Sequence, residues 1–371
     1  MRFSSRKFGI ILFALLVLGL LIYRSSGMLH LGDFSGAKLL AAVRDARESY
    51  LLLSILAVYA CYAVRALRWR EFQKHVGRAR FWNIYAMTLA GFSAVFLLGR
   101  AGEPVRPLLL SRKAGLPIAD TFGIYVLERL LDTASTAVLA AIGLILFSSH
   151  VHQGAAADAL ETAAKTTGSL LFAGVSVAIA VLVYLRLRGT ALLERRLQGW
   201  LAGHSWRASL ARIVLGFIRG IQTIRSWGEL AAAVIFSAVH WFLVLLVFYL
   251  VTQSFGGQLA ALSLSDVILV LAFTLVGSAV QLPGVGGGSQ VACFLAYTTI
   301  FGVEKEPAAA AAIVMWLITF AACSFAGVPL LIREGFSLGK LREMAEQEKE
   351  VIAEEATGGA HTAVRQGESA E

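Results

Sequence analysis

The chain has 371 residues, of which 57% are hydrophobic and 15% are charged. Soluble domains carry about 25% charged residues, so this composition, with a mean hydropathy of +0.71, excludes an ordinary soluble enzyme. The formal net charge of +9 is explained by arginines that cluster between apolar runs, as the positive-inside rule requires. The sequence therefore predicts an all-α polytopic membrane protein with no nucleic-acid partner.

Nine apolar runs follow one another along the chain and are the expected membrane segments. They are 8–23, 50–67, 81–98, 121–147, 169–185, 229–252, 266–282, 289–302 and 308–332. The first run follows three basic residues, and YRSSG after it is not a clear cleavage site. We therefore interpret it as an uncleaved first helix rather than a signal peptide.

The charge of the loops assigns each loop to one side of the membrane. Residues 65–80 carry six basic residues, Arg65 and Arg68 among them, against one acid, and 186–228 carry eight arginines against Glu194. The loop 148–168 holds two acids and one lysine. The first two loops are expected to be cytoplasmic and the third external.

Two segments do not fit single crossings and are predicted to be re-entrant hairpins. The loops on both sides of 81–98 are basic, so residues 81–110 are expected to enter from the cytoplasm, turn at 99–107 and return. Residues 266–302 are broken by LPGVGGGSQ (282–290) between two loops expected outside. This gives about six full spans plus two hairpins; the alternative is eight or nine full spans.

The predicted elements form an inverted repeat. Two helices, a hairpin and a helix over 8–147 are followed by the same order, upside down, over 169–332. Inverted repeats with interrupted membrane segments are typical of transporters that bind near the midplane. We expect one transmembrane domain over 1–335 and a polar cytoplasmic tail over 336–371, a helix and then a disordered end. Both termini are then cytoplasmic.

The tip of the first hairpin, GRAGEPVRP (99–107), places Arg100, Glu103 and Arg106 three residues apart. Arginine forks match phosphate oxygens in a bidentate geometry, and the free N–H groups of a following helix start assist. These three residues are candidates for substrate binding. The alternative is an ordinary cytoplasmic loop with a local salt bridge.

The next helix carries Glu128, Arg129 and Asp132 in the sequence VLERLLD (126–132). Charges inside a membrane segment normally face a partner or water, so these residues are also substrate-binding candidates. They are expected to form a net-negative site beside the Arg100 and Arg106 pair. The alternative is that all these charges only neutralise one another and lock the hairpin against the helix.

The second hairpin tip is rich in glycine, which lets backbone approach a ligand closely. Its candidate residues are Gly284, Gly286, Gly287, Gly288, Ser289 and Gln290. The two polar side chains offer neutral hydrogen bonds, and the alternative is a flexible turn.

His240 lies within another apolar run, 229–252. Its two possible roles are a proton relay and a hydrogen bond to a neighbouring helix.

Three cysteines lie inside apolar runs, without the spacing of a disulfide framework or a zinc site. We expect no metal, no cofactor and no catalytic residues.

The chain resembles the lysylphosphatidylglycerol synthase transmembrane family, also called flippase-like domain proteins. The matching stretches are GRAGEPVRPLLLSRKAGLP (99–117), VLERLLD (126–132) and LPGVGGG (282–288). The resemblance implies a helical bundle with re-entrant segments that moves or binds phospholipids. In the synthases this domain is joined to a soluble aminoacyl-transferase domain, which we do not find in these 371 residues, so aminoacyl transfer is not expected.

These observations predict a non-enzymatic lipid transporter in a bacterial-type inner membrane. Its substrate is expected to be an anionic phospholipid or a polyprenyl phosphate, bound by its headgroup in a midplane cavity. One alternative is a small-solute or ion-coupled secondary transporter. Another is a scaffold that docks a separate lipid- or glycan-modifying enzyme; the oligomeric state is left open.

Overall fold

The computed structural model describes residues 35–148, 226–278, 281–282 and 286–335, with isolated positions between 166 and 177. The predicted helix 8–23, most of the predicted helix 169–185 and the tail from residue 336 lie outside the described residues.

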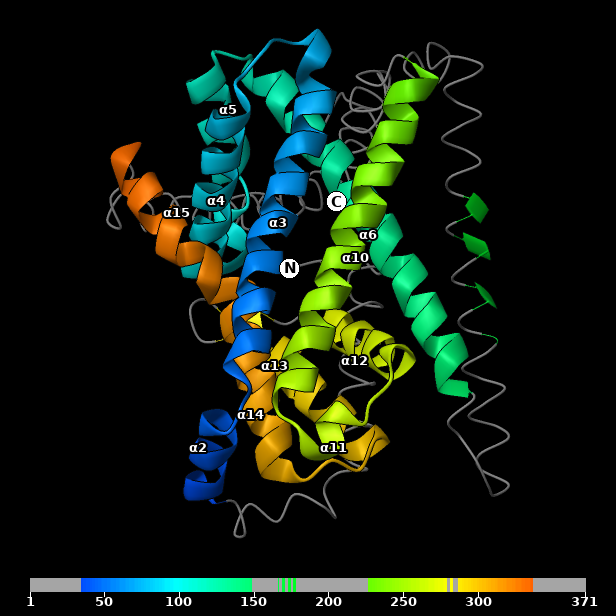
Figure 1. The fold of residues 1–371 in the computed structure, drawn as a ribbon. Helices are drawn as coiled ribbons and strands as arrows, with labels where there is room; N and C mark the ends of the chain where they lie inside the picture. The colour runs from blue at the N-terminus through cyan, green and yellow to red at the C-terminus, as the bar shows by residue number, and fades with distance from the viewer. Residues whose placement is uncertain are drawn as a thin grey trace, which may run out of the picture.

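The described residues form two helical sets (Figure 1). The first set is α2 (Gly36–Arg44), α3 (Glu48–Phe72) with the turn η2 (Gln73–His75), α4 (Phe81–Leu98), η3 (Gly99–Gly102), α5 (Val105–Ala114) and α6 (Ile118–Ser148). The second set is α10 (Trp227–Ser254), α11 (Gly257–Ala260), α12 (Leu264–Gly277), β1 (Gln281–Leu282), β2 (Gly286–Gly287), α13 (Gly288–Leu295), η4 (Ala296–Ile300), α14 (Lys305–Trp316), η5 (Leu317–Ala321) and α15 (Ala322–Arg333).

Four helices are long and apolar enough to cross a membrane. They cover Glu48–His75, Phe81–Leu98, Trp227–Ser254 and Lys305–Arg333. Helix α6 has 31 residues, which corresponds to about 46 Å at 1.5 Å per residue. The fold class is therefore confirmed as a polytopic helical membrane protein, whereas the number of full crossings stays a prediction.

Helices α4 and α5 form the first hairpin. They pack against each other, and Gly77 before α4 lies against Leu116 after α5, so the chain returns to the end from which it came. At the turn, Gly99 has a φ of 65°, a conformation that favours glycine. Gly102 packs directly on the backbone of Ala94, where a Cβ atom has no room.

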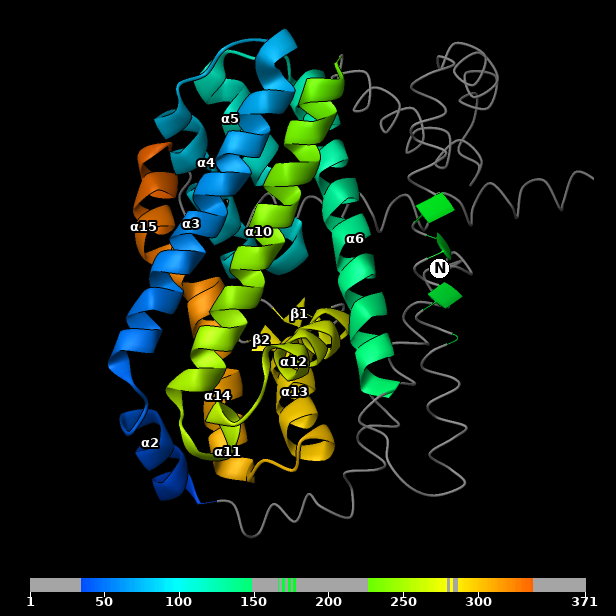
Figure 2. The ribbon, with the colours of Figure 1, turned by 45° about the vertical axis from the view of Figure 1, so that its right-hand side comes forward.

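Helices α12 and α13 form the second hairpin, closed by the short β1–β2 pair. Gln281 pairs with Gly287 in antiparallel register, and Gly277 at the end of α12 packs on the backbone of Gly288. The Glu304 N–H donates to Gln258 Oε1 at 3.0 Å, which joins the two open ends of this hairpin. Figures 1 and 2 show the α4–α5 hairpin and the α12–α13 hairpin at opposite ends of the molecule.

The contacts between elements follow the inverted repeat predicted from the sequence. Helix α3 runs along its counterpart α10. The first helix of each hairpin packs on the last helix of the other set, α4 on α15 and α12 on α6. A glycine lies at both crossings: Gly327 of α15 packs against Leu89 and Ser93, and Gly143 of α6 packs against Ala272.

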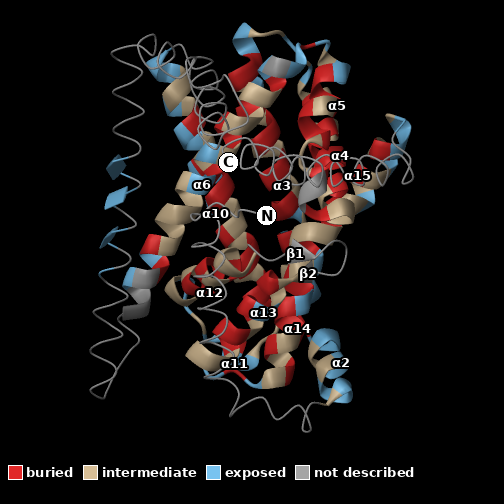
Figure 3. Ribbon diagram, turned by 180° about the vertical axis from the view of Figure 1, so that it is seen from behind, coloured by how far each residue is buried: buried red, intermediate tan, exposed pale blue. Residues whose placement is uncertain are grey.

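Burial follows the faces that the helices present to one another. Buried residues gather between the helices, and exposed residues lie on the outer faces (Figure 3). Several outer residues are large and apolar, such as Phe325 with 83% of its surface exposed and Trp82 with 72%. A water-soluble protein rarely leaves so many such residues open, whereas a bilayer covers them.

Candidate functional site

A cluster of buried charges occupies the centre of the first helical set. Glu128 and Asp132 lie one turn apart on α6 and therefore share a face. That face meets α3 and α5, and Glu128 is 1% exposed. Because charged groups are expensive inside a membrane segment, they need partners of opposite sign.

Two arginines of α3 supply most of those partners. Arg65 Nη1 donates to Glu128 Oε1 at 3.2 Å and to Asp132 Oδ2 at 2.8 Å. Arg68 Nη2 donates to the same two carboxylates at 2.9 and 2.8 Å. The second amino group of Arg68 donates to Ser237 Oγ of α10 at 2.9 Å, so the cluster also joins the two helical sets.

Arg106 of α5 completes the cluster from the first hairpin. Its Nη1 donates to Glu128 Oε2 at 2.5 Å, and its guanidinium group lies 4.8 Å from the ring centroid of Trp69 and 5.3 Å from that of Phe92. Its Nε and Nη2 atoms are buried and have no hydrogen-bond partner among the described residues. Arg106 therefore keeps donor capacity that no described residue uses.

Four of the six charged site candidates come together as the sequence suggested. Arg106, Glu128 and Asp132 are in the cluster. Arg129 lies at its rim, where its Nη2 donates to Asp132 Oδ2 at a distance of 2.9 Å. Within the described residues, Glu103 has no ion pair; the Tyr125 hydroxyl donates to its carboxylate at 2.5 Å. The side chain of Arg100 and all of Gly284 lie outside the described residues.

The prediction that Arg65 and Arg68 belong to a cytoplasmic loop is wrong. Helix α3 continues to Phe72, and both arginines are buried, Arg68 completely. The carboxylates of α6 offset the free-energy cost of burying these two arginines. Hydropathy alone cannot predict such a pairing. Trp69 and Phe72 were the available signal, because they continue the apolar side of the helix beyond Arg68.

The burial of Arg65 and Arg68 also changes the sign of the predicted net charge of the site. The sequence suggested a net-negative group beside an arginine pair, but the cluster holds four arginines against two carboxylates. Its formal charge is +2, counted over Arg65, Arg68, Arg106, Arg129, Glu128 and Asp132. An excess of positive charge with unused buried donors suits an anionic ligand.

A cavity of about 210 Å³ lies beside this cluster, between the two helical sets. Most of its wall is apolar and comes from α3, α10, α12, α13 and α14. Arg65 is the member of the cluster that lines it, together with His240 of α10, whose Nδ1 is buried without a partner among the described residues. The π-helical turn η5 adds Thr319 and Phe320; such turns are frequent at functional sites.

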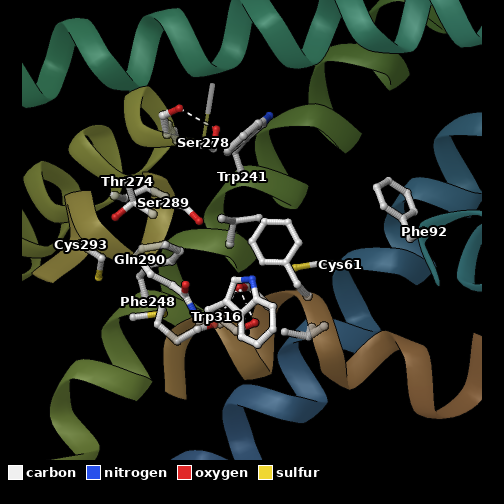
Figure 4. Close-up of a pocket in the computed structure, with 18 of the residues that line it drawn as sticks. Cys61, Phe92, Trp241, Phe248, Thr274, Ser278, Ser289, Gln290, Cys293 and Trp316 are labelled. Carbon is white, nitrogen blue, oxygen red and sulfur yellow. Dashed lines mark hydrogen bonds between the residues drawn. The ribbon is translucent and has the colours of Figure 1, made fainter. Parts of the chain in front are cut away.

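Two of the predicted second-hairpin residues also line this cavity. Ser289 and Gln290 lie in its wall, on the side opposite Phe92 (Figure 4). Gln290 Oε1 accepts a hydrogen bond from the Gly287 N–H at 3.1 Å. Gly286 and Gly287 form β2, and Gly288 begins α13. The second predicted site thus lies at this cavity, whereas the first predicted site is connected to it through Arg65, which pairs with Glu128 and Asp132.

Among the described residues, no three His, Cys, Asp or Glu side chains lie close enough together to hold a metal ion. The polar chemistry of the described site therefore comes from its arginines, its carboxylates and its neutral polar groups.

Comparison with known proteins identifies the family of this chain. The family model for the lysylphosphatidylglycerol synthase TM region matches residues 10–327. A UPF0104 membrane protein from Methanothermobacter thermautotrophicus is 25% identical over 320 residues, which cover 81% of this chain and 89% of that protein. The chain therefore belongs to the family of the lysylphosphatidylglycerol synthase TM region and is a membrane protein.

Proposed function

We propose that the protein is a lipid transporter whose arginine cluster receives the headgroup phosphate of an anionic phospholipid or a polyprenyl phosphate. The observation that carries this proposal is the position of Arg65. It belongs to the arginine cluster, which has a formal charge of +2 with Arg129 at its rim, and it also lines the cavity between the two helical sets. A phosphate in the cavity can therefore reach a guanidinium fork directly.

The size of the cavity supports binding of a headgroup rather than of a whole lipid. Its volume of about 210 Å³ is below the roughly 300–1,000 Å³ of sites that enclose a drug-sized ligand. Acyl chains would stay in the surrounding bilayer while the polar head crosses. The apolar wall keeps the local dielectric constant low, which strengthens the attraction between the phosphate and Arg65.

In this proposal the two carboxylates orient the arginines. Glu128 and Asp132 are occupied by arginines, so they hold the guanidinium groups in place rather than bind the headgroup. A phosphate that enters would share these arginines with the carboxylates.

The inverted arrangement supports alternating access to the cavity. The α4–α5 and α12–α13 hairpins reach the centre from opposite ends, and rocking of the two halves around a central site is the usual way in which inverted repeats move a substrate. Movement would be downhill or coupled to an ion.

We also propose the orientation. The open end of the first hairpin carries a dense group of basic residues: Arg70, Lys74, Arg78, Arg80, Arg112 and Lys113. The positive-inside rule assigns that end to the cytoplasm, in a bacterial-type inner membrane.

The experiment is a translocation assay in vesicles that contain the purified full-length chain. Phosphatidylglycerol with a fluorescent acyl chain is placed in one leaflet, and its arrival in the other is followed by a membrane-impermeant quencher. The proposal predicts transfer well above that of protein-free vesicles. Transfer no faster than in protein-free vesicles, from protein shown to be folded, would overturn it.

A second candidate is a carrier of small anionic solutes, which the small volume of the cavity favours. In the same vesicles, uptake of radiolabelled inorganic phosphate or a small organic phosphate without lipid transfer would support this candidate instead.

A further inference from the structure

The polar groups of the cavity fall into a cationic part and a neutral part. Arg65 forms the first part, and the buried ring of His240 also lines the cavity. The neutral part comes from α12 and the start of α13 and consists of Thr274, Ser278, Ser289 and Gln290. In Figure 4, Thr274, Ser289 and Gln290 lie together on one side of the cavity.

The cationic part has no acid facing it across the cavity. Among the described residues that line the cavity, none is Asp or Glu. The nearby carboxylates of Glu128 and Asp132 are held by Arg65, Arg68 and Arg106. An ammonium group in the cavity would therefore meet the positive charge of Arg65 and find no carboxylate to balance it.

Six aromatic side chains of the described residues line the cavity, and Phe92 is the one whose ring faces Arg65. Its ring centroid lies 5.0 Å from the guanidinium carbon of Arg65 and 5.3 Å from that of Arg106. Two cations already face this ring, so a third is disfavoured there.

The neutral part offers both donors and acceptors. The Nε2 of Gln290 and the hydroxyl of Ser289 have no hydrogen-bond partner within the described residues. The hydroxyls of Thr274 and Ser278 donate to backbone carbonyls at 2.7 and 2.6 Å, so their lone pairs stay available as acceptors. A ligand hydroxyl both donates and accepts, whereas an ammonium only donates.

We propose, building on the proposed function, that the cavity selects anionic lipids whose headgroup ends in an uncharged hydroxyl-bearing group, such as glycerol or a sugar. The phosphate lies toward Arg65, and the hydroxyls lie toward Ser289 and Gln290. Headgroups that end in an amine are rejected because the cavity supplies a cation and no acid.

The first test compares two lipids with the same fluorescent acyl chain in vesicles that contain the full chain. Phosphatidylglycerol should move at least about tenfold faster than phosphatidylethanolamine, because an unpaired polar group and a like charge both penalise the amine. Equal rates for the two lipids would overturn the inference.

The variant Gln290→Glu tests the missing acid directly. Glutamate has nearly the same shape and keeps the acceptor for the Gly287 N–H, but it adds a carboxylate to the neutral part. Phosphatidylglycerol transfer should fall about tenfold or more, and phosphatidylethanolamine transfer should rise. Thr298→Val is the control, because Thr298 lies one helix turn beyond the cavity wall and donates to a backbone carbonyl; it should leave both rates unchanged.

A second variant covers the case in which Gln290→Glu does not fold. Ser289→Ala removes one donor and should slow phosphatidylglycerol about three- to tenfold, while phosphatidic acid, which has no terminal hydroxyl group, should move at the rate seen without the substitution. An equal loss for both lipids would overturn the role of Ser289 and, with it, the inference.

The outcomes separate this inference from the function on which it rests. If no anionic lipid moves with the unchanged protein, the proposed function fails and takes the inference with it. If anionic lipids move but the substitutions do not alter the preference between headgroups, only the inference fails.

Discussion

Glu128 accepts hydrogen bonds from Arg65, Arg68 and Arg106, which come from two different helices. It is buried among groups that would otherwise repel one another. Removing one partner of a buried ion pair leaves an uncompensated charge, which costs more than the pair itself contributes. Here a single carboxylate balances more than one cation, so its loss is not compensated locally.

The substitution Glu128→Gln should therefore destabilise the protein by about 3–5 kcal/mol. The control Arg129→Gln should cost only about 0–1 kcal/mol, because a third of its side chain is exposed and such pairs contribute little. Unfolding of the purified protein by denaturing detergent would measure both. Equal midpoints for the two variants would contradict the assigned role of Glu128.

The sequence predicted part of this cluster and missed the rest for a physical reason. Arg106, Glu128 and Asp132 stood out because charges next to or inside an apolar run are rare. Arg65 and Arg68 did not, because they adjoin a basic loop and look like its beginning. Their burial depends on carboxylates 60 or more residues away, a pairing that no local pattern contains.

At the scale of elements, each hairpin depends on a helix from the other half. Gly327 of α15 packs on the backbone of Leu89 in α4, and Gly143 of α6 packs on α12, where an added Cβ would lie 2.7 Å from the Ala272 Cβ. These two glycines occupy equivalent places in the inverted repeat. Both allow a close approach that a larger residue prevents.

Alanine at either position should therefore loosen the crossing and cost about 1–3 kcal/mol, the usual range for overpacking. Gly327→Ala should have the larger effect because it meets backbone. The matched control is Gly123→Ala in α6, which has open space around it and should stabilise the helix by up to about 1 kcal/mol. Equal unfolding midpoints for the two crossing variants and the Gly123→Ala control would contradict the close approach of the helices at these crossings.

The sequence predicted the positions of the interrupted segments better than the local irregularities of the helices. Hydropathy and loop charge indicated both interrupted segments and their glycine turns at 99–107 and 282–290. They did not indicate the π-helical turns η4 and η5 or the β1–β2 pair, because such irregularities depend on packing between helices rather than on local propensity.

At the scale of the whole molecule, the two hairpins open toward opposite ends, and the cavity lies between them. The open end of the first hairpin is near Gly77 and Leu116, and that of the second is near Gln258 and Glu304. A membrane across the middle of the molecule would separate these ends.

Single-cysteine labelling tests this arrangement in a background without Cys61, Cys293 and Cys323. Cysteines introduced as Arg78→Cys and Ala261→Cys, both at exposed positions, should react with a membrane-impermeant maleimide from opposite faces. The first should react only when the cytoplasmic face is open. Labelling of both from one face would rule out hairpins that enter from opposite sides.

The central claim is that an arginine fork at the cavity holds the lipid phosphate. It is tested most directly by phosphatidylglycerol translocation with Arg65→Lys beside Arg129→Lys. Lysine keeps the charge but loses the bidentate geometry, so the first variant should slow transfer about tenfold or more, by analogy with the loss of one charged hydrogen bond. The second should stay within about twofold, since Arg129 lies at the rim. Undiminished transfer by folded Arg65→Lys would contradict the claim.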